Sequence, residues 1–286
     1  MIKVFQAKAK IIYNKRVTDN YFQAAVMSAE ISRVALPGQF VNIRVVDTND
    51  VLLRRPFSIH RVEGEKIIFL YEVKGKGTEI LSQRKEGEYL DIIGPLGNGF
   101  DLNWQTGKLA NRQTILVAGG MGVAPLVFLA ERLVRVEGVR CKVEEKIKPL
   151  VLIGAKTKTQ VLCENEFKKS GCEVKVATDD GSRGFKGWVT DLLDRHVCEG
   201  GHIGPPLQRI IYACGPAPML KALAQIAGRN NIDAVGSLEA HMACGIGSCM
   251  GCVVKVARAQ PQAGDDFEYK RVCKEGPVFD LKQIIW

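Results

Sequence analysis

The sequence TILVAGGMGVAP, residues 114–125, joins a short apolar run to a cluster of glycines and then to a helical pattern. The apolar run predicts a buried strand, and Pro125 suits the first turn of a helix. Glycines at such a junction let the phosphates of a dinucleotide approach backbone N–H groups at a helix N-terminus. The spacing is not G-x-G-x-x-G, and tight strand–helix turns also favour glycine. The turn alone therefore predicts a βα unit that could bind a nucleotide.

Downstream of this turn, predicted strands and helices alternate. The strands cover residues 150–153, 173–178, 209–213 and 232–237, and the helices cover 126–136, 164–169, 189–197 and 217–227. Alternation of this kind predicts a parallel sheet with helices on both faces, here over residues 112–238. Ligands of such sheets bind beyond the carboxyl ends of the strands. Cys214 ends one predicted strand there, and it is either a site residue or a small residue in a tight turn.

Upstream of the turn, residues 1–105 show the pattern of a β domain. Six short runs rich in β-branched and aromatic residues are separated by turn-forming residues, at 3–13, 21–31, 40–46, 57–60, 66–73 and 89–93. They predict a six-stranded antiparallel barrel. Within it, RRPFSI (54–59) is either an edge strand or a cofactor site, since arginine pairs with pyrophosphate and an aromatic ring packs on a flat cofactor. GKGT (75–78) is either a phosphate loop or a hairpin turn. GPLGNGF (94–100) predicts a turn-rich exit from the barrel.

The composition narrows the class of protein and the cellular compartment that we expect. The chain has 286 residues, with 40 Lys+Arg against 31 Asp+Glu and nine cysteines. The basic residues are scattered, which favours a solvated surface over nucleic-acid binding. The sequence has neither a run of ~18 apolar residues nor an export signal, so we expect a cytoplasmic protein. In reducing cytoplasm, cysteines bind metal, do chemistry or pack, rather than form disulfides.

Four cysteines have the spacing of a metal site. Cys244-x4-Cys249-x2-Cys252 is followed by Cys273, and only small or apolar residues, GIGS and MG, separate the first three. This is the spacing of plant-type loops that hold a [2Fe–2S] cluster. Zinc and free thiols are the alternatives, although zinc ligands usually come as two C-x2–4-C pairs. Residues 239–286 therefore predict a small iron–sulfur tail, which completes a multi-domain β plus α/β fold.

Together these motifs resemble the ferredoxin–NADP reductase superfamily, and within it the electron-transfer subunits of dihydroorotate dehydrogenase B. The resemblance rests on RRPFSI, GPLGNGF, VAGGMGVAP (117–125), YACGPAPML (212–220), MACGIGSCMGC (242–252) and RVCKEGPVF (271–279). It implies an FAD site lined by Arg55, Pro56, Phe57, Ser58, Leu70, Tyr71, Glu72, Gly77 and Thr78. It implies an NAD site at Gly119, Gly120 and Gly122, with Cys214 and Gly215 near the nicotinamide. The four cysteines would hold the cluster.

The resemblance implies a function without a catalytic acid or base on this chain. Electrons would enter from an FMN-containing dihydroorotate dehydrogenase catalytic subunit, pass through [2Fe–2S] and FAD, and leave to NAD+ as co-substrate. Two copies of each subunit would form a heterotetramer. The alternatives are a paralogous NAD(P)H:ferredoxin or sulfide reductase-type subunit, and a non-catalytic zinc-stabilised nucleotide-binding regulator. Two loops, residues 136–148 and the gap from Cys252 to Cys273, are longer than the family pattern implies.

Overall fold

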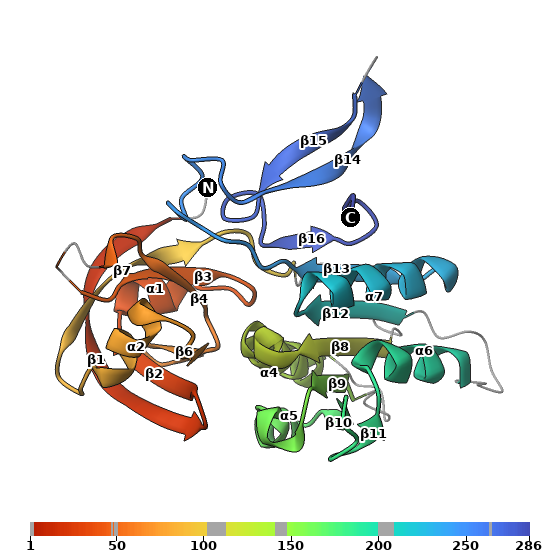
Figure 1. Cartoon of the computed structure of the whole chain (residues 1–286), viewed down its shortest axis with the longest axis horizontal. Helices are drawn as coiled ribbons and strands as arrows, with labels where there is room; N and C mark the ends of the chain where they lie inside the picture. Colours follow the sequence, from red (N-terminus) through yellow and green to blue (C-terminus); the bar gives the residue numbers. More distant parts are fainter. Residues whose placement is uncertain are drawn as a thin grey trace. The chain divides into compact units, whose positions relative to one another are not determined.

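The computed structural model describes residues 3–46, 48, 51–101, 113–140, 148–199, 209–262 and 265–286. The chain divides into two compact units. One contains residues 1–99 and 239–278, and the other contains residues 100–238 and 279–284. The expected domain junction at 105–112 lies outside the described residues, as does most of the charged connection at 136–148. Figure 1 shows the elements of both units.

The first unit is built on one curled antiparallel sheet with the order β4-β3-β7-β1-β2-β6-β5. Two short helices, α1 and α2, accompany it. The elements are β1 (Phe5–Thr18), β2 (Tyr21–Met27), α1 (Ala29–Val34), β3 (Phe40–Arg44), β4 (Arg55–Ser58), β5 (Arg61–Glu63), β6 (Lys66–Glu72), α2 (Lys76–Gln83) and β7 (Tyr89–Leu96). The prediction of an antiparallel sheet is confirmed, but the predicted count of six strands is wrong, because the sheet has seven.

The seventh strand, β5, directly follows the strand predicted at 57–60. The chain changes partners at Ile59 and His60, where the Ile59 N–H donates to Gln39 and the His60 N–H donates to Ile68. β4 therefore pairs with β3, and β5 pairs with β6 at the other end of the strand order. Two residues span at most about 7 Å, so the sheet must curl until its two edges approach each other. No glycine, proline or asparagine lies between Phe57 and Glu63 to mark this change of partner, which is why the sequence did not reveal it.

The second unit is a parallel sheet with the order β11-β10-β9-β8-β12-β13-β16. The predicted parallel pairing is confirmed for β8 through β13. The elements are β8 (Gln113–Gly119), η3 (Gly120–Gly122), α4 (Val123–Arg140), β9 (Leu150–Ala155), η4 (Lys158–Gln160), α5 (Glu164–Lys169), β10 (Glu173–Thr178), β11 (Phe185–Lys186), α6 (Val189–Glu199), β12 (Arg209–Cys214), α7 (Ala217–Arg229), β13 (Asp233–Ser237) and β16 (Val278–Asp280). Helix α4 packs on β8 and β12, whereas α6 packs on β8, β9 and β10 and against α7.

The C-terminal segment contributes to both units. Its longer part contains a hairpin, β14 (Val253–Gln262) and β15 (Asp265–Arg271), which fills the long gap between Cys252 and Cys273. Its end adds β16 to the parallel sheet next to β13. The iron–sulfur tail expected from the sequence therefore also completes the sheet of the second unit. None of the helices formed by the described residues is long and apolar enough to cross a membrane.

Candidate functional site

In the first unit, Arg55 and Gly77 meet at the start of helix α2. A Cβ atom added to Gly77 would lie 2.6 Å from Nε of Arg55, so the missing side chain makes room for the guanidinium. The Thr78 hydroxyl accepts hydrogen bonds from the N–H groups of Lys74 (3.0 Å) and Gly75 (3.2 Å) and caps the helix. A guanidinium beside a helix N-terminus favours an anion. The two predicted motifs, RRPFSI and GKGT, thus meet at one corner whose charge suits an anion, called here the anion corner.

Other residues of the predicted flavin set lie inside the barrel. The Phe57 ring stacks on Phe69 at 5.2 Å and packs against Tyr71 at 5.6 Å between ring centroids. Tyr71 is 2% exposed, and its hydroxyl donates to Oδ1 of Asn14 at 2.8 Å. Burial raises the pKa of Tyr71, and the bond to Asn14 opposes that rise only in part. The Phe57 and Tyr71 rings therefore pack in the core and hold β4 against β6.

The remaining residues of that set stand at the ends of the same strands. Pro56 and Ser58 on β4 are partly exposed, as is Glu72 at the end of β6, whereas Leu70 is buried. The Glu72 carboxylate pairs with Nζ of Lys74 at 3.0 Å. Hydrogen bonding to Glu72 raises the pKa of Lys74, so this amine is a cation near neutral pH.

In the second unit, the glycine turn after β8 packs against the end of β12. Ala118 and Cys214 are register partners on these adjacent strands. A Cβ atom on Gly122 would lie 1.9 Å from the carbonyl oxygen of Cys214, and one on Gly215 would lie 3.0 Å from N of Gly119. A Cβ atom on Gly120 would contact nothing within 4 Å. Gly122 and Gly215 are therefore required by the packing of the two strand ends, whereas Gly120 leaves open space for a ligand.

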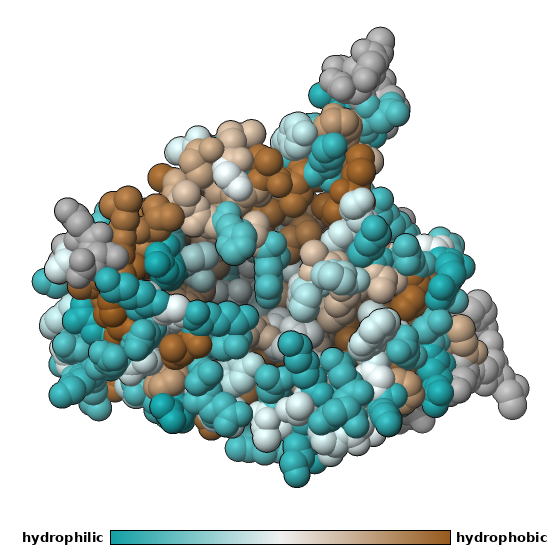
Figure 2. All heavy atoms as spheres, in the orientation of Figure 1, coloured by the Kyte–Doolittle hydropathy of each residue, from teal (hydrophilic) through white to brown (hydrophobic). Residues whose placement is uncertain are grey.

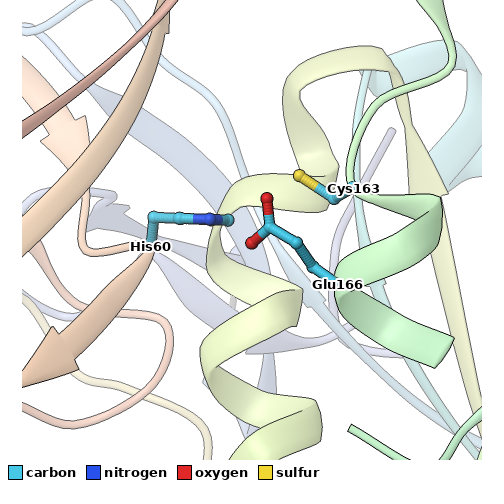
Figure 3. Close-up of side chains that lie close together, drawn as sticks. All are labelled: His60, Cys163 and Glu166. Carbon is cyan, nitrogen blue, oxygen red and sulfur yellow. The ribbon is translucent and has the colours of Figure 1, made fainter. Parts of the chain in front are cut away.

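Figure 3 draws three side chains outside the predicted sites, and they come from separate units. His60 is buried in the barrel unit between β4 and β5. Cys163 and Glu166 stand at the start of α5 in the second unit. Cys163 has a φ of 61°, and its carbonyl accepts the N–H of Phe167 at 3.0 Å. Cys163 therefore forms the turn that begins this helix.

The four predicted cluster ligands come together in the first unit. Backbone N–H groups point at three of the sulfur atoms. Ser248 donates to Cys244 at 3.3 Å, Gly251 to Cys249 at 3.4 Å and Cys273 to Cys252 at 3.4 Å. Such N–H···S contacts stabilise thiolates and tune iron–sulfur centres.

The pKa shifts of Cys244 and Cys273, and the cysteine next to each of them, divide the four cysteines into two pairs. Burial raises the pKa of Cys244, but hydrogen bonds from the N–H groups of Ile246, Cys249 and Ser248, together with the neighbouring Cys249 thiol, lower it to about 6. Burial and the adjacent Cys252 raise the pKa of Cys273 to about 12. Within the described residues, no three of these sulfur atoms lie within 4.8 Å of one another. Cys244 thus pairs with Cys249, and Cys252 pairs with Cys273.

The C-terminal part of the first unit, residues 239–278, is called here the cluster-binding segment. Within it, Arg271 links the chain near Cys273 to the loop between Cys244 and Cys249. Nε of Arg271 and its own backbone N–H both donate to Oε2 of Glu275, at 2.9 and 2.7 Å. The same guanidinium donates to the carbonyl of Gly247, between the first two ligands. The guanidinium lowers the pKa of Glu275 to about 2, so the pair is charged at neutral pH. Both residues belong to the motif RVCKEGPVF, but the sequence alone assigned them no role. An Arg and a Glu four residues apart on either side of a candidate ligand would have indicated this ion pair.

Comparison with known proteins agrees with this geometry. The iron–sulfur cluster binding domain of dihydroorotate dehydrogenase B matches residues 239–285, and the oxidoreductase NAD-binding domain matches residues 116–225. The electron transfer subunit of dihydroorotate dehydrogenase B (NAD(+)) from Desulforamulus reducens is 40% identical over 288 residues, covering 100% of both chains. The subunit of the same name from Caldanaerobacter subterraneus is 37% identical and covers 99% of both.

Solved structures show the same architecture. The chain matches a structure of NADH-dependent reduced ferredoxin-NADP oxidoreductase, reported for flavin-based electron bifurcation, with a TM-score of 0.78 and 29% identity over 98% of this chain and 90% of the other. A ferredoxin NADP+ reductase from Neisseria gonorrhoeae, with bound FAD and NADP, has a TM-score of 0.63 at 14% identity, over 78% of this chain and 91% of the other.

A curled antiparallel sheet followed by a parallel nucleotide-binding sheet defines an oxidoreductase of the ferredoxin reductase class. The cysteine-rich C-terminal segment distinguishes this chain within that class. The chain belongs to the family of dihydroorotate dehydrogenase B electron transfer subunits.

Proposed function

We propose that this chain is the electron-transfer subunit of a cytoplasmic, NAD-dependent dihydroorotate dehydrogenase of pyrimidine biosynthesis. The observation that carries the proposal is the paired set of four cysteines in a chain that matches this family over its full length. Residues 1–105 would bind FAD, residues 112–238 would bind NAD, and residues 239–286 would bind the cluster. A bound [2Fe–2S] cluster carries single electrons and FAD exchanges one or two, so together they link a one-electron donor to hydride transfer to NAD+.

The barrel residues fit FAD as a phosphate-bearing ligand. Arg55 and the start of α2 at Gly77 and Thr78 would hold the pyrophosphate, because they offer a guanidinium and a helix N-terminus at one corner. Pro56 and Ser58 would contact the ring system from the exposed edge of β4. Phe57, Leu70 and Tyr71 would shape the site from the core and through their backbones, with Glu72 at its margin.

The cysteine pairs fit a two-iron cluster better than a single metal ion. A single zinc ion needs four ligands about 2.3 Å from one centre, which places all four sulfur atoms close to one another. Two pairs, Cys244 with Cys249 and Cys252 with Cys273, suit one iron each. This observation disfavours the zinc-stabilised regulator.

The strand ends of the second unit fit NAD. Gly119, Gly120 and Gly122 would bring backbone N–H groups to the pyrophosphate, with the open space at Gly120 facing it. Cys214 and Gly215 would border the nicotinamide. Cys214 is 4% exposed, so its contribution would come from its backbone and small size.

The partner would be an FMN-containing catalytic subunit, in a heterotetramer of two copies of each chain. Ile246 and Met250 are each 49% exposed, and both flank Cys249, which is itself exposed. Figure 2 shows apolar surface over the region where Figure 1 places the cluster-binding segment. Large apolar side chains beside an exposed ligand suit a protein surface that receives electrons.

Co-expression with a dihydroorotate-oxidising FMN subunit tests this function. We expect a red-brown complex that contains flavin and iron and reduces NAD+ with dihydroorotate. A colourless chain without iron would contradict the enzyme and support the regulator. A coloured chain that accepts no electrons from the FMN subunit but exchanges electrons with ferredoxin would support the paralogous reductase instead.

Substitution of Gly77 by alanine tests whether the anion corner at Arg55 binds FAD. The new Cβ atom would displace the Arg55 guanidinium, which is flexible, so we expect normal folding but FAD affinity about tenfold weaker, because a charge-assisted bond to phosphate is lost. FAD titration of the flavin-depleted full chain measures this. Ser82→Ala, in the last turn of the same helix, is the matched control and should leave the affinity unchanged. Equal affinity in both variants would remove Arg55 from the site.

A further inference from the structure

Two asparagines of the barrel hold the cluster-binding segment. Asn42 lies on β3, and Asn98 lies just after β7, the strand that pairs with β3. Nδ2 of Asn42 donates to the carbonyl of Cys244 at 3.0 Å, and Nδ2 of Asn98 donates to the carbonyl of Glu275 at 3.0 Å. One bond therefore reaches the first ligand, and the other reaches the chain two residues beyond the fourth.

Two glycines beside these bonds leave no room for a side chain of their own. Gly245, with a φ of 69°, would place a Cβ atom 2.4 Å from Nδ2 of Asn42. Gly97, with a φ of 72°, would place one 2.6 Å from Cδ of Pro277. The Asn98 N–H also donates to the carbonyl of Gly276 at 2.5 Å. The GPLGNGF motif, which the sequence explains only as a turn, thus makes a second contact with the segment.

The same strands support the flavin motif. β3 pairs with β4, and Asn42 is the register partner of Pro56 while Ile43 is the partner of Arg55. The carbonyl of the first cluster ligand is therefore one hydrogen bond away from the strand that neighbours RRPFSI. Asn42 is 1% exposed, so this bond is shielded from competing water.

We propose that Asn42 and Asn98 are positioning residues that fix the cluster-binding segment on the β3–β7 strand pair. They thereby set the separation between the cluster and the flavin-binding strand β4. This inference rests on the proposed function for its cofactors. Electron transfer slows steeply as the separation of two centres grows, so a loosened segment affects transfer between the centres before it affects either centre alone.

The test compares Asn42→Ala, Asn98→Asp and the double variant with wild type in the full, cofactor-loaded chain. Alanine leaves the Cys244 carbonyl without its donor. Aspartate keeps the shape of Asn98 but cannot donate, and it repels the carbonyl of Glu275. Asn230→Asp is the matched control, since Nδ2 of Asn230 donates to the carbonyl of Ile226 at 2.9 Å in the other unit. Asn98 is exposed, so its variant should fold even if the Asn42 variant does not.

Amide hydrogen exchange is the first measurement. We expect exchange in residues 244–252 and 271–276 to accelerate by about tenfold in Asn42→Ala, since a lost buried hydrogen bond shifts a local opening equilibrium by that order. The acceleration should be smaller in Asn98→Asp, because the bond of Asn98 is exposed to water. The remainder of the barrel and the Asn230→Asp control should exchange as wild type. Hydrogen exchange requires no turnover, so it tests whether Asn42 and Asn98 hold the cluster-binding segment even if the proposed function is wrong.

Rapid mixing with NADH is the second measurement. Bleaching of the cluster absorbance should be slower than in wild type, because electron transfer between the flavin and the cluster slows as their separation grows. Reduction of an artificial acceptor by NADH should not change. The inference would be overturned if the double variant exchanged its amide hydrogens and bleached its cluster absorbance at wild-type rates. Absence of iron and flavin from the wild-type chain would instead overturn the proposed function.

Discussion

Replacement of Cys249 by serine should abolish reduction of NAD+ by dihydroorotate in the complex and leave NADH oxidation by an artificial acceptor close to wild type. Cys249 is the exposed member of the Cys244–Cys249 pair. A serine hydroxyl is a much poorer ligand for iron than a thiolate, so the path from the partner would be interrupted at its entry. The anion corner at Arg55 and the glycine turn lie on other elements and keep their geometry.

The two activities are measured on one preparation, together with iron content and the electron paramagnetic resonance spectrum of the reduced cluster. Cys198→Ser is the matched control, because Cys198 is an exposed cysteine of α6 in the other unit. It should change neither activity. Parallel loss of both activities in Cys249→Ser would mean that the cysteine loop is structural. Retention of both would place the electron entry elsewhere.

The sequence predicts those parts of the fold whose pattern is local. The strand–turn–helix at 114–125, the short helix at 164–169 and the parallel strands follow directly from periodicity and glycine placement. The set of four candidate cysteine ligands is likewise predicted from spacing alone. In each case a single stretch of chain carries both the signal and the structure.

The parts that the sequence does not predict depend on contacts between distant segments. The chain changes sheet edges at Ile59 and His60 with no glycine, proline or asparagine beside them, and only the pairing partners at Gln39 and Ile68 reveal the change. An aromatic ring at Phe57 suits a flat ligand, and only the structure shows that Phe69 and Tyr71 pack against this ring. Nothing in the sequence around Asn42 points to Cys244, because 202 residues separate them.

Gly122→Ala should cause the largest defect of any single methyl addition in the nucleotide-binding turn. The new Cβ atom would lie 1.9 Å from the carbonyl oxygen of Cys214 and 2.4 Å from its carbon. Both are backbone atoms of an adjacent strand end, so they cannot move aside as a flexible side chain does. Overpacking of this kind costs about 1–3 kcal/mol. We expect the melting temperature to fall by several degrees and NADH affinity to fall by about tenfold or more, because the turn and Cys214 must separate.

Gly228→Ala provides the opposite case in the same unit. Gly228 lies in α7, and a Cβ atom there contacts nothing within 4 Å, so alanine should stabilise the chain by about 0.5–1 kcal/mol through helix propensity. Thermal unfolding and NADH titration of both variants separate the two effects, with FAD content as the check that the barrel is intact. If Gly122→Ala bound NADH as tightly as Gly228→Ala, the contact between the glycine turn and Cys214 would be irrelevant to the nucleotide. A selective loss of NADH affinity would instead locate the nucleotide at the ends of β8 and β12, because the three atoms nearest to the new Cβ atom belong to Cys214 and Gly215.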